Sequence, residues 1–113
     1  MIEEIILDYL NNALEQPVWL EIPKGEVIPA EYVLLEKTGS DRENYINYAM
    51  IAIQSYADSM YAAASLNEAV KAAMDGIITL NEIGKAKLNS DYNFTDTETK
   101  KYRYQAVYDI THY

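Results

Sequence analysis

The sequence contains no cysteine, one histidine, four glycines and three prolines. Without cysteine it has no disulfide bond, no thiolate metal ligand and no cysteine nucleophile. With so few glycines it has no glycine-rich phosphate-binding loop. The one histidine, His112, has no serine and aspartate at the spacing of a catalytic triad, and we expect it to lie in a frayed terminus. We therefore expect no enzymatic activity, no cofactor and no bound metal ion.

Long apolar runs and an excess of positive charge are also missing. No apolar stretch approaches the roughly 20 residues of a membrane helix, and Glu3 and Glu4 stand where a secretory signal needs basic residues. We therefore expect a soluble, intracellular protein with no membrane partner. The formal net charge of −9 opposes direct binding to nucleic-acid phosphates.

The charge is distributed unevenly. Residues 1 to 36 carry eight acids and one base, whereas residues 84 to 113 carry four acids and five bases. A chain with an acidic front and a locally basic back can pair head to tail with its copies. Solvated surface charge is the plainer interpretation for most of these residues.

Half of the residues are hydrophobic, and 11 of the 113 are tyrosines. This content predicts one domain over residues 1 to 113 with one real core. Tyrosine favours strands, and it also suits interfaces because its ring can be buried while its hydroxyl stays wet. We interpret the high number of tyrosines as an indication that the protein forms interfaces with other chains.

The segment from residue 44 to residue 78 predicts a central strand followed by a long helix. The strand, Asn44 to Tyr56, is apolar on both faces, which is typical of an interior strand. Asp58 or Ser59 is the expected N-cap, although a capping box at Ser65 offers a later start. The apolar helix positions recur at the helical spacing: Ala62, Leu66, Ala69, Val70, Ala73 and Ile77.

Flanking segments complete the predicted sheet. Residues 2 to 15 read as a helix, and residues 31 to 37 as a strand. Val18 to Ile22 reads as a short strand with Val18, Leu20 and Ile22 pointing inward and Trp19 on the other face. Residues 85 to 90 and 102 to 112 are the last two strands. We expect an α/β (α+β) fold: a mixed, mostly antiparallel sheet of about four to five strands with two helices on one face.

Two polar segments between these elements need separate interpretation. Residues 38 to 43 (TGSDRE) are predicted to form a loop. Residues 91 to 100 alternate oxygen ligands like the start of a calcium loop, but the required glycine and glutamate are replaced by Asp96 and Tyr102. Tyr92 and Phe94 in this polar segment either contact a partner or fold back on their own sheet.

Three tracts carry a resemblance to a known family. They are Ala52–Tyr56 (AIQSY), which leads through Ser59 into the alanine-rich helix, Leu88–Asp96 (LNSDYNFTD) and Tyr102–Gln105 (YRYQ). Over about residues 17 to 113 the chain resembles the tail terminator proteins of long-tailed bacteriophages, especially those of Gram-positive hosts. Many of these proteins have an arginine after the serine at the helix start, where this chain has Met60.

The resemblance implies a non-catalytic virion protein of the tail and neck, assembled in the host cytoplasm. Its expected partners are five further copies in a homohexameric ring, the tail tube protein and the head completion or stopper protein. DNA passes through the ring without specific binding. Two alternatives stay open: another neck or tail-tube ring component, and a small tyrosine-rich ligand-binding module.

Two groups of residues are the candidate sites under this interpretation. The expected subunit or partner contacts are Trp19, Tyr92, Phe94, Lys100, Lys101 and Arg103. A lumen that lets DNA slide needs acidic or neutral side chains, and the expected lining is the loop with Asp41, Arg42 and Glu43. Alternatively this loop meets the tail tube or the head, and the negative charge keeps the unassembled protein dispersed.

Overall fold

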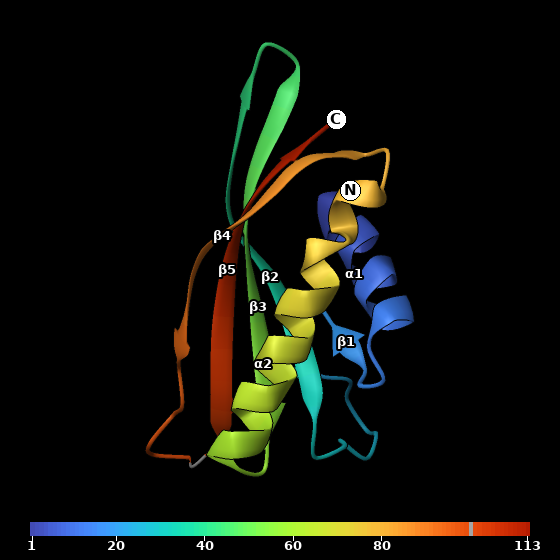
Figure 1. The fold of residues 1–113 in the computed structure, drawn as a ribbon. Coiled ribbons are helices and arrows are strands. Elements are labelled where there is room, and N and C mark those ends of the chain that lie inside the picture. The colour runs from blue at the N-terminus through green and yellow to red at the C-terminus, as the bar shows by residue number, and fades with distance from the viewer. Residues whose placement is uncertain (100) are drawn as a thin grey trace.

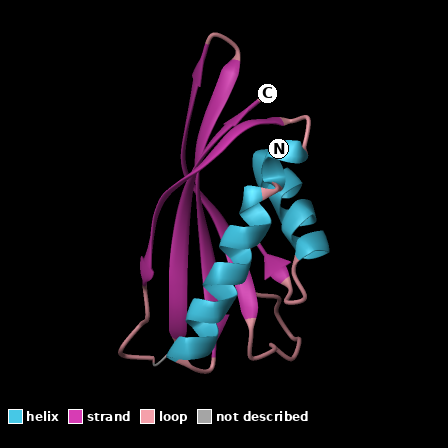
Figure 2. Ribbon diagram, in the orientation of Figure 1, coloured by secondary structure: helices cyan, strands magenta, loops and turns pink. Residues whose placement is uncertain are grey.

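A computed structural model describes residues 1–99 and 101–113. It contains two α-helices, one 3-10 helix and five strands in one sheet (Figures 1 and 2). In chain order these elements are α1 (Ile2–Ala13), β1 (Val18–Trp19), β2 (Tyr32–Glu43), β3 (Ile46–Ala57), α2 (Met60–Asp75), η1 (Ile77–Thr79), β4 (Ile83–Asn93) and β5 (Tyr102–His112). The predicted α+β class, with two helices and a mixed sheet, is confirmed.

The sheet has the strand order β1-β2-β3-β5-β4. The pairs β2–β3, β3–β5 and β5–β4 are antiparallel, and for the consecutive pairs β2–β3 and β4–β5 this is expected of strands joined by short connections. β1 pairs parallel to β2 at Val18 and Trp19, so the sheet is mixed and mostly antiparallel, as predicted. The reason for the parallel pair is that residues 20 to 31 carry the chain back before β2 begins.

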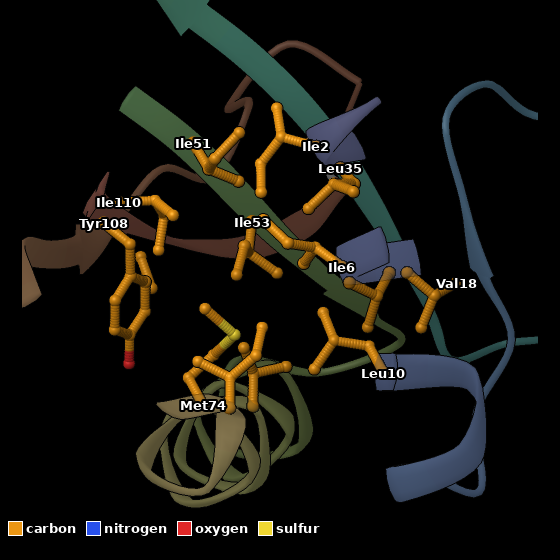
Figure 3. Packing of buried hydrophobic residues seen from close by; sticks show 14 of the residues in the cluster. Ile2, Ile6, Leu10, Val18, Leu35, Ile51, Ile53, Met74, Tyr108 and Ile110 are labelled. Atoms are coloured by element: carbon orange, nitrogen blue, oxygen red, sulfur yellow. The ribbon is translucent and has the colours of Figure 1, made fainter. Parts of the chain in front are cut away.

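Both helices pack on the same face of the sheet (Figure 1), and the core lies between the helices and the sheet (Figure 3). Ile2, Ile6 and Leu10 of α1 are buried because they recur every four residues along one side of the helix. Ile51 and Ile53 of β3 point toward this layer and are fully buried. No helix of the described residues lies on the opposite face of the sheet, which we call the helix-free face.

The start of α2 is as predicted, and its buried face is as predicted at Leu66 and Val70 but not throughout. The Ser59 hydroxyl accepts a 3.1 Å hydrogen bond from the backbone N–H of Ala62, so Ser59 rather than Ser65 is the N-cap. Ala69, predicted on the apolar face, is exposed, and Asn67 is buried. Alanine loses little when it is exposed, so the larger Leu66, Val70 and Met74 determine which side of the helix faces the core.

The predicted loop over residues 38 to 43 is wrong. These residues belong to β2 and pair with β3 down to Glu43 opposite Ile46. Asn44 and Tyr45, predicted as the start of a strand, form the turn instead, with φ angles of 51° and 66°. Positive φ at both central residues of a two-residue hairpin turn matches the right-handed twist of the strands. Residues 38 to 43 are polar because both of their faces are exposed in this hairpin.

Other boundaries also differ from the predictions. β1 ends at Trp19, and Leu20 and Ile22, predicted to point inward, are exposed. β4 extends from Ile83 to Asn93, beyond the predicted residues 85 to 90. His112 is not frayed, since it pairs with Asn47 and ends a strand. Within the described ranges, no helix is long and apolar enough to cross a membrane.

Candidate interface on the helix-free face of the sheet

A row of aromatic side chains and one arginine crosses the helix-free face from one sheet edge to the other. We call this row the belt. It lies where β2 begins and β3 ends, at the opposite end of the sheet from the β2–β3 turn. Its members, from β1 to the end of β4, are Trp19, Tyr32, Tyr56, Arg103, Phe94 and Tyr92.

Strand register explains why these residues meet. Tyr32 lies opposite Tyr56, and Tyr56 lies opposite Arg103. Directly opposed residues of antiparallel strands project to the same face. Val33 and Ser55 alternate with the two tyrosines and are buried on the helix side, so the belt belongs to the other face.

The aromatic rings of the belt are in contact from β1 to β3. The ring centroids of Trp19 and Tyr32 lie 5.7 Å apart, and those of Tyr32 and Tyr56 lie 4.7 Å apart in a stacked arrangement. Tyr32 and Tyr56 are buried, at 6% and 7% exposure, although no helix covers them. Burial, and then the neighbouring Tyr56, raises the pKa of the Tyr32 hydroxyl. This part of the belt is a second, smaller packed layer.

Arg103 joins the stacked tyrosines to the exposed end of the belt. Its guanidinium carbon lies 5.7 Å from the ring centroid of Tyr56 and 4.4 Å from that of Phe94. Its Nη1 donates a 2.8 Å hydrogen bond to the Tyr56 hydroxyl, and its Nε donates a 2.6 Å bond to the Phe94 carbonyl. A planar guanidinium can stack and donate in two directions at once, which fixes Phe94 relative to the sheet.

A directed chain of hydrogen bonds runs alongside the belt. The Tyr56 hydroxyl donates to Gln54 Oε1 over 3.1 Å, and Gln54 Nε2 donates to Gln105 Oε1 over 2.8 Å. Gln105 Nε2 then donates to the Tyr92 hydroxyl over 2.6 Å. Each oxygen is used as an acceptor, so the Tyr92 hydroxyl hydrogen ends the chain as a donor. Tyr92 is 41% exposed, so the chain of hydrogen bonds ends at a residue of the surface.

The same segment is fastened to α2 on the other face of the sheet. Asp91 Oδ2 accepts 2.9 Å hydrogen bonds from Asn67 Nδ2 and Lys71 Nζ, and Lys71 also pairs with Glu68 at 2.9 Å. The bond from Lys71 lowers the pKa of the Asp91 carboxyl, and the bond to Asp91 raises the pKa of Lys71. Adjacent residues thus have different tasks: Asp91 anchors β4, and Tyr92 belongs to the belt.

Four of the six residues predicted as contacts lie together in the belt: Trp19, Tyr92, Phe94 and Arg103. Lys101 is exposed beside it and lines a hollow of about 390 Å³ with Tyr32 and Tyr56, whereas Lys100 lies outside the described residues. The predicted partner contacts remain a prediction. Phe94 and Tyr92 were predicted either to contact a partner or to fold back on their own sheet. Their rings do rest on the sheet, and the two residues are still 40% and 41% exposed, so a partner could also reach them.

The three residues predicted to line a lumen lie at the other end of the molecule. Asp41, Arg42 and Glu43 are exposed and belong to β2 just before the turn. Asp41 lies opposite Tyr48, and Arg42 lies opposite Asn47. The structure therefore separates the two predicted groups along the length of the strands.

Sequence reasoning missed the buried half of the belt. Tyr32, Tyr56, Gln54 and Gln105 were not among the predicted site residues, although Gln54 and Tyr56 belong to the tract that carries the family resemblance. For Gln54 and Tyr56 the available signal was their alternation with Ile53 and Ser55, which places them on the face away from the helices. Across residues 1–99 and 101–113, no cluster of acids and histidine is suited to a metal ion.

Comparison of the sequence with models of protein families and with curated proteins finds no significant match.

Proposed function

We propose that the protein is a structural component of the bacteriophage neck, a tail terminator that forms a ring at the end of the tail tube. The proposal starts from the resemblance carried by residues 52–56, 88–96 and 102–105. On this proposal the protein acts in the virion, binds the tail tube and the head completion protein, and lets DNA pass without specific binding.

The belt is the observation that carries the proposal. Two of the resembling tracts, residues 88–96 and 102–105, supply Tyr92, Phe94 and Arg103, which are built into one ordered surface. Aromatic and arginine side chains dominate the energetic centres of protein interfaces. Arg103 holds the surface in place before any partner arrives, so binding costs little conformational entropy. A preordered, half-exposed aromatic surface is what a docking protein needs.

The two ends of the sheet also differ in chemistry, which suits a component that joins two different neighbours. The belt end presents aromatic rings and Arg103. The β2–β3 hairpin presents Asp41 and Glu43, and it extends past both helices in Figure 1. A ring subunit whose strands run along the ring axis would offer one end to the tail tube and the other to the head completion protein.

The experiment is negative-stain electron microscopy of the purified chain, alone and mixed with tail tubes that lack their terminator. We expect six-fold rings, either free or seated on the tube ends, and mass photometry should give six chains per ring. A protein that stays monomeric at high concentration and leaves the tube ends bare would contradict the proposal.

The same samples test the ligand-binding alternative. The hollow of about 390 Å³ beside Tyr32 and Tyr56 is the observation that favours it. A binding module would be monomeric or dimeric and would gain thermal stability from a small metabolite. We favour the ring because Tyr32 and Tyr56 stack on each other, so one face of each ring is already occupied within the protein.

A further inference from the structure

Among the described residues, the sheet has a long unpaired edge on each side, along β2 beyond the two residues of β1 and along β4. β2 pairs with β1 at Val33 and Leu34, and no other described strand pairs with that edge up to Glu43. At the other side of the sheet, β4 pairs with β5 alone among the described strands. Unpaired backbone N–H and C=O groups along an edge are ready to pair with another chain.

Neither edge is covered by side chains or by a helix of the described residues. Every residue from Glu36 to Tyr45 is exposed, and Ile83 is the one buried residue among the eleven of β4. Proteins that remain monomeric usually shorten, twist away or cover such edges. Edges this long and open are available for pairing with a strand of another chain, although each is interrupted by a register shift, at Lys37/Gly39 in β2 and at Ile83/Lys85 and Leu88/Ser90 in β4.

The charges on the β2 edge are sorted by face. Its acids, Glu36, Asp41 and Glu43, lie opposite Ala52, Tyr48 and Ile46 of β3. Those β3 positions share the strand parity of Tyr56, so the three acids project on the helix-free face. The two bases of this stretch, Lys37 and Arg42, lie opposite Ile51 and Asn47 and project on the helix side.

The β4 edge carries the opposite charge on the same face. Lys85 lies opposite Thr111, and Lys87 lies opposite Asp109. Thr111 and Asp109 in turn lie opposite Tyr48 and Met50, which places both lysines on the helix-free face. Among the described residues neither lysine has a salt-bridge partner.

The two edges are also matched in level and direction. One row of paired residues runs from Lys85 through Thr111 and Tyr48 to Asp41, so Lys85 and Asp41 stand at the same height on opposite edges. Three successive antiparallel pairings separate β2 from β4, so the two edge strands run in opposite directions. Side-by-side copies would therefore pair them antiparallel, with Lys85 level with Asp41 and with Lys87 and Glu43 diagonal to that pair.

We propose that the β2 edge of one copy pairs with the β4 edge of the next copy, which continues the sheet from subunit to subunit. This inference rests on the proposed ring for its closure but not for the pairing itself. The contact is heterologous, so it repeats around a rotation axis. Pairing of like edges would set acid against acid or lysine against lysine, which is unfavourable in a sheet.

The absence of cysteine permits a clean cross-linking test. Ser40 and Ala86 are small, uncharged and in one row, through Ala49 and Ile110. The full chain carrying both S40C and A86C, treated with a short bis-maleimide, should give a ladder of products up to the ring size. Each single-cysteine variant should give no cross-linked product, because a β2 edge meets a β4 edge and never a second β2 edge. A matched control pair, S65C with T97C, uses exposed positions away from both edges and should give only background.

Charge reversal tests the pairing by a second route. K85E with K87E, or D41K with E43K, should weaken association by about tenfold, since each cross-strand charge pair contributes up to about 1 kcal/mol. Combining all four changes in one chain should restore association, because every contact then has the opposite polarity. Dimers from a single-cysteine variant, or no ladder above the control, would overturn the proposal.

Further outcomes separate this inference from the others. Rings in the microscope, without cross-linking of the S40C/A86C variant, would overturn edge pairing and leave the proposed function standing. If the variant gives a cross-linked ladder but the protein does not bind tail tubes, edge pairing stands and the proposed function is wrong. If the D41K/E43K variant forms normal rings that retain DNA at low salt, these acids line the lumen, and the edge pairing is wrong.

Discussion

The Tyr9 hydroxyl in α1 donates a 2.6 Å hydrogen bond to the Ala73 carbonyl in the last turn of α2. A Cβ atom added to Gly76 would lie 2.7 Å from that same hydroxyl oxygen. Gly76 ends α2 in an ordinary right-handed conformation, so its φ does not require glycine. The close approach of Tyr9 requires it, and the contact between the two helices depends on this missing side chain.

This relationship predicts a strongly coupled pair of substitutions. G76A should displace the Tyr9 ring and lower the free energy of unfolding by about 1 kcal/mol, through loss of the hydrogen bond to Ala73. In a Y9F background the hydroxyl is gone, and G76A should be neutral or slightly stabilising because alanine restricts the unfolded chain. Urea unfolding of the four proteins measures this coupling. Equal effects of G76A in both backgrounds would contradict the steric explanation.

A second prediction concerns the stability of the belt. R103K keeps the charge but cannot stack on Phe94 while donating to Tyr56, so we expect a loss of about 1–2 kcal/mol in unfolding free energy. The fluorescence of Trp19 and urea unfolding report the change. K101A, at an exposed position beside the belt, is the control and should change stability by less than about 0.5 kcal/mol. Equal stability of R103K and the unchanged chain would show that the guanidinium does not hold the belt.

The exposed end of the belt should matter for assembly more than for folding. Tyr92 and Phe94 are each about 40% exposed, so the double alanine variant should remain folded by circular dichroism. It should lose binding to tail tubes in a co-sedimentation assay, because both rings leave the proposed contact surface. Y61A removes a more exposed tyrosine, at 83%, and should bind normally. Unfolding of the double variant would instead make these two rings part of the core.

Stability should also depend on pH through His112. Burial lowers the pKa of its imidazole, and Lys37 and the N-terminus act in the same direction, while a hydrogen bond with the Tyr113 backbone and the charge of Glu3 oppose them. The unfolded state therefore binds a proton more readily than the folded state. This contribution to stability is complete above the ordinary pKa of about 6.5 and is lost as the pH falls below it.

The measurement is urea unfolding between pH 7.5 and pH 5. The unchanged chain should lose stability over this interval, and H112N should show a smaller slope because the titrating group is gone. Protonation of Asp91, whose pKa is lowered by Lys71, should also reduce stability. This loss occurs at lower pH and should be the same in both proteins. Parallel curves for the two proteins would contradict this role of His112.

The sequence by itself determined the local elements with strong periodicity. Ile6 and Leu10 follow the helical spacing, Ser59 is a good N-cap, and the alternation from Tyr102 to His112 indicates a strand with the bounds that the structure has. These signals are local, since each depends on residues within a few positions of one another. They were sufficient for the α+β class and for both helices on one face.

The tertiary structure decided the features that depend on pairing between strands distant in the sequence. Polar residues 38 to 43 are a strand because β3 lies beside them, and Asn44 with Tyr45 makes the turn that permits it. Tyr56 and Arg103 meet across 47 positions of sequence. Register relates residues that are distant in the chain, and a shift of one position would move every side chain to the other face. Periodicity along one segment carries no information about that choice.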